Sequence, residues 1–166
     1  MDLHVCLATY SDVPMMNRDV KASWGKSFEE DLAEQDSGLH SCFIAILGAK
    51  VIGCGFIRWA GPRDEAAIRL FPDSPEIYRL DVRQEFRSKG IGTKLIEAME
   101  SSASVKGFQS VSLGVDYDNP RAYKLYKRLG FEDTELTEYY DEYIYPISEG
   151  KTATARDLCR YLVKQI

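Results

Sequence analysis

The chain divides into short stretches with a strand-like pattern of apolar positions and longer stretches with a helical period. Strand-like patterns cover residues 3–9, 42–47, 51–59, 76–82, 110–115 and 131–147. Helical patterns cover residues 14–24, 26–35, 90–106 and 120–129, with proline at two helix starts and Gly130 at a helix stop. The expected element order is therefore β-α-α-β-β-β-α-β-α-β.

This order predicts an α/β fold with a mixed sheet. Three consecutive strands favour antiparallel pairing, and the later β-α-β unit favours a parallel crossover. Gly48, Ala49 and Lys50 separate two apolar runs and predict a hairpin. Residues 60–75 contain three prolines and are predicted to be a loop.

Residues 1–147 are predicted to form one domain, and residues 148–166 a C-terminal extension. Residues 148–151 are interpreted as a linker, after which Thr152 or Thr154 can cap a helix. The apolar stripe of this helix would consist of Ala155, Leu158, Cys159, Leu162, Val163 and Ile166. Such a stripe either covers the protein's own sheet or docks on a second copy, so a homodimer is one hypothesis.

Composition narrows the class of protein. The chain has 166 residues, 45% of them hydrophobic, and a net charge of −5, which argues against nucleic acid or an anionic membrane as the main partner. No run approaches the ~20 apolar residues of a membrane span, and the N-terminus lacks a signal-peptide pattern, so a cytoplasmic protein is expected. The four scattered cysteines are expected to be buried thiols, and the two histidines lack ligand-spaced partners, so no metal site is expected.

The loop between the strand at residues 76–82 and the following helix carries the clearest chemical signal. Its sequence is Arg87, Ser88, Lys89, Gly90, Ile91 and Gly92. Two glycines at a helix start allow backbone N–H groups to converge on one point, and the two cations stand beside them. Such a site suits a phosphate or pyrophosphate.

Two common phosphate-binding motifs do not fit this chain. A dinucleotide fingerprint has a third glycine where Leu95 stands, and it follows its strand directly, whereas seven residues separate Val82 from Gly90. A Walker loop ending at Gly25, Lys26 and Ser27 would need a glycine at the position of Val20.

The loop does match the [Arg/Gln]-x-x-Gly-x-[Gly/Ala] element of the GCN5-related N-acetyltransferases, and two remote motifs agree with it. Glu76, Leu80 and Val82 match the Glu-x-x-x-Leu-x-Val strand that often precedes this element. The later family motif is matched by Asn119, Ala122, Leu125, Tyr126, Gly130 and Phe131. The chain therefore resembles this superfamily over residues 1 to about 147, with Ser88 at a position where glycine is common.

The resemblance implies a mixed, mostly antiparallel central sheet with helices on both faces, and acetyl-CoA as co-substrate without a metal. It implies that the loop, including Thr93 at the helix start, binds the pyrophosphate of coenzyme A. Backbone groups of Leu80, Asp81 and Val82 would run along the pantetheine, which Asn119 would hold. A backbone N–H near Val82 would polarise the thioester carbonyl.

Tyr126 is the candidate proton donor to the coenzyme A sulfur, by resemblance. Asn119 and Tyr126 are seven residues apart, which places them on nearly the same face of one helix. Acyl transfer to an amine needs a proton for the thiolate leaving group, and a phenol can supply it. The alternative is a core aromatic residue packed beside Leu125 and Leu129.

Glu76 is the candidate general base, acting directly or through a water. A carboxylate among apolar neighbours can have its pKa raised by burial; the alternative is a strand-edge glutamate that faces solvent. A regular strand would place on one face Glu76, Tyr78, Leu80 and Val82. Arg79 and Asp81 would lie on the other face and pair with each other.

The acceptor amine is less well defined. Residues 28–36 and 132–142 contain eleven of the 26 acidic residues and no Lys or Arg. If both stretches flank the acceptor site, their field would attract a small cationic amine or the amine of a peptide; the alternative is two solvated faces. Four tyrosines of the last segment either line the acceptor pocket or pack on the sheet: Tyr139, Tyr140, Tyr143 and Tyr145. Trp24 is similarly ambiguous.

The sequence therefore predicts an acetyl-CoA-dependent N-acetyltransferase that works by direct attack in a ternary complex. A second hypothesis is a module that binds acyl-CoA without turnover and acts as a sensor. A proton donor at sulfur together with a base favours the enzyme, because a sensor needs neither. Within the enzyme hypothesis, a protein N-terminal or lysine acceptor competes with a small amine.

Overall fold

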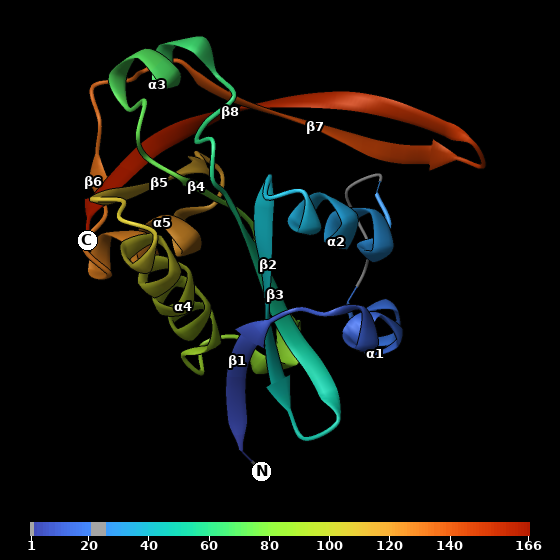
Figure 1. Ribbon diagram of the computed structural model, residues 1–166. Coiled ribbons are helices and arrows are strands. Elements are labelled where there is room, and N and C mark those ends of the chain that lie inside the picture. Colours follow the sequence, from blue (N-terminus) through green and yellow to red (C-terminus); the bar gives the residue numbers. More distant parts are fainter. Residues whose placement is uncertain (1, 21–25) are drawn as a thin grey trace.

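The computed structural model describes residues 2–20 and 26–166 (Figure 1). The strands are β1 (Leu3–Leu7), β2 (His40–Leu47), β3 (Lys50–Arg58), β4 (Glu76–Val82), β5 (Ser110–Asp116), β6 (Glu132–Asp133), β7 (Tyr139–Ser148) and β8 (Lys151–Gln165). The α-helices are α1 (Val13–Asp19), α2 (Phe28–Asp36), α3 (Glu65–Leu70), α4 (Ile91–Val105) and α5 (Pro120–Arg128). Two short 3-10 helices are η1 (Tyr10–Asp12) and η2 (Gln84–Phe86).

The strands form one mixed sheet in the order β1-β2-β3-β4-β5-β8-β6, and β7 pairs with β8. Among the described strands, β4 and β5 are the one parallel pair, and the other pairs are antiparallel. This confirms the predicted mixed, mostly antiparallel sheet. The hairpin expected around Gly48 is the β2–β3 connection, in which Leu47 pairs with Lys50.

Helices cover both faces of the sheet. On one face, α4 packs Leu95 and Met99 against strand residues such as Ile77 and Leu113. On the other face, α1 and α2 bury their apolar sides against β2 and β3, and α3 covers a smaller cluster around Tyr161. Figure 1 shows α4 and α5 on one side of the sheet and α1 and α2 on the other. No helix among the described residues is long and apolar enough to span a membrane.

The helix starts predicted at residues 14, 26, 90 and 120 lie within two residues of those in the structure, but one helix end and one predicted loop need correction. Ser27 caps α2 in a capping box with Glu30. The helix expected over residues 14–24 ends at Asp19, and its later part, with Trp24, lies outside the described residues. The predicted loop at residues 60–75 contains α3, which Asp64 caps by accepting the N–H groups of Ala66 and Ala67. A helix of six residues is too short for its period to show in the sequence.

The predicted C-terminal helix is wrong, because residues 151–165 form strand β8. β8 pairs with β7 over its first part and with β5 over its last part. Its inner part is covered on both sides of the sheet: Tyr161 and Val163 pack toward α3, while Leu162 packs in the α4 cluster. A strand that is buried on both faces lacks the alternation of apolar and polar residues. The apolar residues of β8 are therefore also spaced as in the apolar stripe of a helix. Residues 148–151, predicted to be a linker, belong to the turn of the hairpin.

β4 carries an irregularity that changes which side chains share a face. Arg79 has a φ of +50°, and the register between β3 and β4 shifts next to it. Tyr78 therefore packs in the α1–α2 cluster, whereas Leu80 and Val82 pack on the opposite, α4 side. The prediction that Leu80 and Val82 share a face with Glu76 and Tyr78 is therefore wrong. A bulge shifts the strand's two-residue period by one position.

A buried ion pair fixes this bulge. Both guanidinium nitrogens Nη1 and Nη2 of Arg79 donate to the Asp31 carboxylate of α2, at 2.8 and 3.0 Å. The Asp31 side chain is 1% exposed and the Arg79 side chain 10%. The expected pairing of Arg79 with Asp81 is therefore wrong, because Asp81 instead accepts from Arg87 at 3.3 Å.

The four cysteines are free thiols. Cys42, Cys54 and Cys159 are buried, and Cys6 is partly buried. Burial raises the pKa of Cys54 and of Cys159 to about 12, so both stay protonated at neutral pH. These thiols agree with the expected structural role.

We expect Asp31→Ala to lower the free energy of unfolding by about 3–5 kcal/mol, because it leaves the Arg79 guanidinium buried without its carboxylate. Chemical denaturation measures the change. The matched control is Asp36→Ala in the same helix, where the carboxylate accepts a bond from the exposed Tyr10 hydroxyl; there we expect a loss of less than about 1 kcal/mol. Equal losses in both variants would contradict this account of the bulge.

Candidate active site

β4 and β5 separate soon after they meet. Their parallel pairing comprises two residue pairs, Glu76 with Ser112 and Ile77 with Leu113. Beyond Ile77 the β5-facing side of β4 is open to other partners. The N–H of Arg83 points toward β3, where it bonds the Ile52 carbonyl oxygen at 3.0 Å. Since N–H directions alternate along a strand, the N–H of Val82 points to the opposite side, into this opening.

A cleft of about 700 Å³ begins at this opening and runs between the start of α4 and helix α5. It is lined by Leu80, Asp81, Val82, Phe86, Arg87, Ser88, Gly90, Ile91, Gly92, Thr93, Asn119, Pro120, Arg121, Ala122, Lys124, Leu125, Tyr126 and Arg128. Every residue predicted to bind coenzyme A is in this set except Lys89. We call this space the donor cleft.

The start of α4 gives the donor cleft a group of backbone donors. Gly90 is the N-cap residue and has a φ of +79°, which glycine adopts without strain. The N–H groups of its first turn have no intrahelical acceptor, and among the described residues no side chain caps them. The residues of this turn line the cleft. With the dipole of a helix of 15 residues behind them, these N–H groups suit an anion.

The charged residues of the loop have different positions. Arg87 donates to the Val82 carbonyl oxygen at 2.7 Å and so ties the loop back to β4. Ser88 has a φ of +61°, which explains why glycine is common at this position, and its hydroxyl accepts a bond from Arg121 at 2.9 Å. Lys89 lies outside the cleft lining, with its ammonium 5.4 Å from the centre of the Phe86 ring.

Helix α5 adds cations to the donor cleft that were not predicted from the sequence. Arg121, Lys124 and Arg128 all line it. They are three and four residues apart, a spacing that places side chains on one helix face. Together with Arg87 they make one rim of the cleft positively charged. Their spacing was visible in the sequence, but nothing there showed that this face turns toward the loop.

Asn119 and Tyr126 both reach the donor cleft, as their spacing predicted. The Asn119 side-chain oxygen caps α5 by accepting the N–H of Ala122 at 3.1 Å, which leaves the amide nitrogen for another partner. Tyr126 is 8% exposed and packs edge-on against Phe131, with ring centres 5.9 Å apart. Burial raises the pKa of Tyr126 to about 12, so its hydroxyl holds a proton through the physiological range.

Glu76 lies in β4 at the point where the two strands still pair, and it is outside the donor cleft. It is 3% exposed, so the alternative of a solvent-facing glutamate is wrong. Its carboxylate accepts a bond from Arg58 at 2.8 Å and another from the Tyr139 hydroxyl. Burial raises the pKa of Glu76, and the charge of Arg58 and the bond from Tyr139 offset part of this effect.

A second cavity, of about 290 Å³, lies on the α3 side of the sheet above Glu76. It is lined by Arg58, Arg63, Asp64, Glu65, Tyr139, Tyr140, Asp141, Glu142 and Arg156. Two of these residues, Arg58 and Tyr139, bond the Glu76 carboxylate directly. We call this space the acceptor cavity.

Tyr139 lines the acceptor cavity and lies against Gly114 of β5. A Cβ atom on Gly114 of β5 would lie 2.5 Å from a carbon of the Tyr139 ring, so only glycine permits this contact. Gly114 follows Leu113, the last β5 residue that pairs with β4. The Tyr139 ring therefore covers the point where the strands separate, on the face opposite to Tyr126 and α4. The donor cleft and the acceptor cavity thus lie on opposite faces of the sheet.

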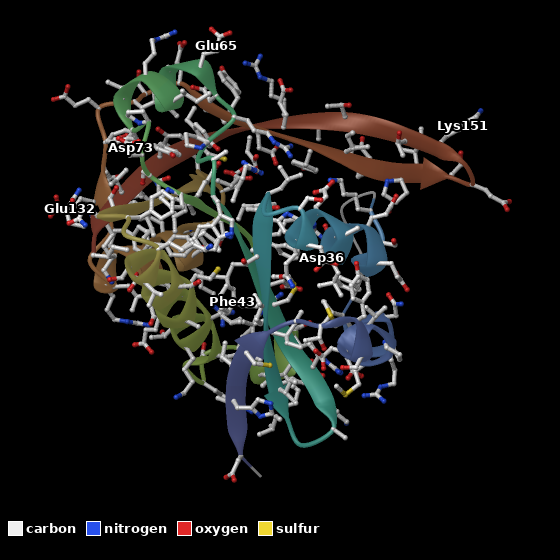
Figure 2. All side chains as sticks on the ribbon, in the orientation of Figure 1. Asp36, Phe43, Glu65, Asp73, Glu132 and Lys151 are labelled. Atoms are coloured by element: carbon white, nitrogen blue, oxygen red, sulfur yellow. The ribbon has the colours of Figure 1, made fainter. Side chains whose placement is uncertain are left out.

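Most acidic residues of the two acidic stretches have partners. In α2, Asp31 binds Arg79, Glu34 pairs with Lys26, and Glu30 caps the helix. In the later stretch, Asp133 pairs with Lys127 and Glu142 with Arg156. Asp141 faces the acceptor cavity, and among the tyrosines Tyr139 is buried while Tyr140 lines the cavity. The long β7–β8 arm that carries Tyr143 and Tyr145 extends away from the body to its turn near Lys151 (Figure 2).

His40, Asp31 and Glu34 come together with donor atoms within 4.8 Å of one another, a grouping that the sequence spacing did not reveal. These atoms already have protein partners. His40 bonds the Asp31 carbonyl oxygen through Nε2 and the Tyr78 hydroxyl through Nδ1, each at 2.8 Å. Burial lowers the pKa of His40, which favours the neutral ring. The group acts as a hydrogen-bond network behind the β4 bulge.

Comparison with known proteins gives the family. The model of the acetyltransferase (GNAT) family matches residues 10–131. The chain belongs to this family. The matched region includes β4, the loop, the start of α4 and helix α5, which together line the donor cleft.

Individual GNAT relatives are distant. An uncharacterized N-acetyltransferase of Methanocaldococcus jannaschii is 30% identical over 123 residues, which cover 71% of this chain and 50% of the relative. An N-alpha-acetyltransferase of Sulfurisphaera tokodaii is 28% identical over 120 residues, 68% of this chain and 67% of the relative. A GNAT family acetyltransferase from Elizabethkingia anophelis, solved with acetyl-CoA bound, has a TM-score of 0.65 at 17% identity and covers 99% of this chain and 98% of its own. This likeness confirms the GNAT fold.

We expect Tyr139→Phe to raise the pKa of Glu76 further, because the variant removes a hydrogen bond that stabilises the carboxylate. A ¹³C NMR titration of the Glu76 carboxyl carbon measures this. Tyr140→Phe is the matched control, since Tyr140 stacks on Arg156 with 3.9 Å between guanidinium carbon and ring centre. A pKa that falls or stays constant in Tyr139→Phe would contradict the assigned network.

Proposed function

We propose that the protein is an N-acetyltransferase that transfers the acetyl group of acetyl-CoA to a primary amine in a ternary complex. The observation that carries this proposal is the separation of β4 and β5. A cationic cleft lies on the α4 face of the sheet, and a cavity lined by Arg58 and Tyr139, which both bond the buried Glu76 carboxylate, lies on the other face. Two substrates can therefore meet there without a covalent enzyme intermediate.

The donor cleft fits coenzyme A in charge and shape. The bare N–H groups at the start of α4 suit the pyrophosphate, and Arg121, Lys124 and Arg128 add positive charge around it. The pantetheine would continue along Leu80, Asp81 and Val82, where β4 lacks its β5 partner and can bond the amide groups of the ligand. The Asn119 amide nitrogen is available to a pantetheine carbonyl oxygen. Acetyl-CoA supplies the activated thioester.

Transfer needs three contributions from this chain. The N–H of Val82 donates to the thioester oxygen and stabilises the negative charge that develops there. Glu76 accepts a proton from the acceptor ammonium, directly or through a water, so that its nitrogen can attack the carbonyl carbon. Tyr126 donates its phenolic proton to sulfur as the C–S bond breaks and the C–N bond remains. The amide nitrogen then loses its second proton, which restores Tyr126, and the proton on Glu76 returns to solvent.

The environments of the two groups suit opposite roles. Tyr126, with a pKa of about 12, is fully protonated before the reaction and can act as an acid. Glu76 has a raised pKa, which makes its carboxylate a stronger base than an exposed glutamate. Because both carboxylate oxygens already accept hydrogen bonds, a bridging water is the simplest route to the amine.

The class of acceptor has two candidates from the sequence, a small cationic amine and a peptide amine. The name of the Sulfurisphaera tokodaii relative, N-alpha-acetyltransferase, favours a peptide amine. The chain spans half the length of the Methanocaldococcus relative, so the activity of the whole relative is not transferred to it. A non-catalytic acyl-CoA sensor is the competing function, and it requires neither Tyr126 nor Glu76.

A homodimer and a cytoplasmic location stay predictions. The dimer hypothesis was based on the stripe of a C-terminal helix, and those residues form β8. The β7–β8 arm does expose apolar side chains, including Ile144 and Ile147. If two copies of the chain contact each other through this arm, they form a homodimer through a different surface from the one predicted.

We expect Tyr126→Phe to lower kcat by roughly 10² to 10⁴, the range for loss of a general acid, with the Kd of acetyl-CoA nearly unchanged. Release of coenzyme A, followed with a thiol reagent, measures turnover, and calorimetry measures binding. Tyr123→Phe is the control in the same helix, because its hydroxyl bonds Asp133 at 2.8 Å and does not line the cleft. Unchanged turnover in Tyr126→Phe would refute its role, and tight binding without turnover on any amine would favour the sensor.

A further inference from the structure

Most charged groups of the acceptor cavity already have partners within the protein. Arg58 binds Glu76, and Arg156 lies 3.4 Å from the Glu142 carboxylate. Asp64 caps α3 through its side-chain oxygen. Glu65, at the outer end of α3 (Figure 2), lies 3.9 Å from Arg69. These groups shape the cavity and have little charge left to offer a ligand.

Two charged groups remain, one of each sign. Within the described part of the chain, the side chains of Arg63 and Asp141 make no hydrogen bond or ion pair. Burial raises the pKa of the Asp141 carboxyl, and the charges of Arg58 and Arg63 offset part of this effect. The field of Arg63 also acts on Glu76, so its guanidinium lies within electrostatic range of both carboxyls.

The backbone holds Arg63 in place. The two residues before it, Gly61 and Pro62, are buried. Gly61 has a φ of +82°, and a Cβ there would lie 2.8 Å from the Ser74 carbonyl oxygen. Asp64, directly after Arg63, caps α3. Arg63 therefore belongs to the constrained segment directly before α3, which lies beside the β7–β8 arm (Figure 1), and it lines the acceptor cavity.

We propose that the acceptor is an amine that also carries a carboxylate, of the size of a free amino acid, and that Arg63 binds this carboxylate. This inference rests on the proposed acetyl transfer and names its substrate class. The amine of such a molecule would lie toward Glu76 and Asp141, and its carboxylate would pair with the Arg63 guanidinium, which matches the geometry of a carboxylate. A zwitterion thus satisfies both unpaired groups of the acceptor cavity at once.

Other amines fit this cavity less well. The cavity lining holds four carboxylates and three guanidiniums, and a polyamine or an aminoglycoside would bring further positive charge close to Arg63, whose guanidinium has no carboxylate partner among the described residues. The cavity volume of about 290 Å³ is also at the lower limit of ligand sites, which hold roughly 300–1,000 Å³. An amine without a carboxylate would leave the Arg63 guanidinium unpaired. Specificity for the zwitterion follows from both effects.

The test uses pairs of acceptors that differ only in the carboxylate. Free L-amino acids are compared with their decarboxylated amines, and a polyamine, an aminoglycoside and short peptides complete the panel, all at saturating acetyl-CoA. We expect kcat/KM to be higher for the amino acid of at least one pair. Arg63→Gln should raise the KM of that amino acid roughly 10- to 100-fold, the loss of a charge-assisted bond, with kcat nearly unchanged. It should leave the decarboxylated amine unaffected.

Arg69→Gln is the matched control, because Arg69 lies on α3 with an exposed side chain and does not line the cavity. Turnover confined to amines without a carboxylate, or confined to the peptides, would overturn this inference and leave the proposed acetyl transfer intact. An Arg63→Gln variant with an unchanged KM would also overturn it. Absence of turnover on the entire panel would instead reject the acetyl transfer, and the inference with it.

Discussion

The early separation of β4 from β5 is the constraint on which the site depends. Two neighbouring parallel strands normally bond each other along their length, yet here the pairing comprises two residue pairs. The bulge at Arg79 lies in the part of β4 that leaves β5, and the buried pair of Arg79 with Asp31 holds it. Because of the bulge, Leu80 and Val82 turn toward α4 while Glu76 and Tyr78 stay on the other side. One local irregularity thus gives a single strand a role on both faces of the sheet.

The two faces have different chemistry, which suits a reaction between two substrates of different kinds. On the α4 side, backbone N–H groups, arginine and lysine side chains and the buried Tyr126 phenol line the larger cleft. On the α3 side, a smaller cavity of mixed charge lies above a buried carboxylate. Tyr139 connects them: its ring fits against Gly114, and its hydroxyl bonds Glu76. Tyr126 and Glu76, the two groups proposed to exchange protons with the substrates, therefore reach the sheet from opposite faces.

Local signals in the sequence predicted the donor cleft well, because its parts are encoded by neighbouring residues. Glycines at a helix start, a strand before them, and the spacing of Asn119 and Tyr126 need only local geometry. The parts that depend on distant contacts could not be predicted. The sequence of β8 has the apolar spacing of a helix because both faces of this strand are buried. The bulge in β4 depends on the ion pair with Asp31 of α2, which is distant in the sequence from Arg79. The neighbours of Glu76 come from β3 and β7, and Arg63 comes from a segment predicted to be a plain loop. These residues come together around one cavity only in the folded chain, so no local sequence pattern could indicate their arrangement.

The most direct test of this account is a crystal structure with a non-hydrolysable acetyl-CoA analogue. The account predicts that the pantetheine lies between β4 and β5, with the analogue's carbonyl oxygen accepting the N–H of Val82 and the atom in place of sulfur within hydrogen-bond distance of the Tyr126 hydroxyl. It also predicts that the acetyl group points through the opening toward Glu76 and the acceptor cavity. An analogue bound outside the opening, or with its acyl group directed away from Tyr126, would contradict it.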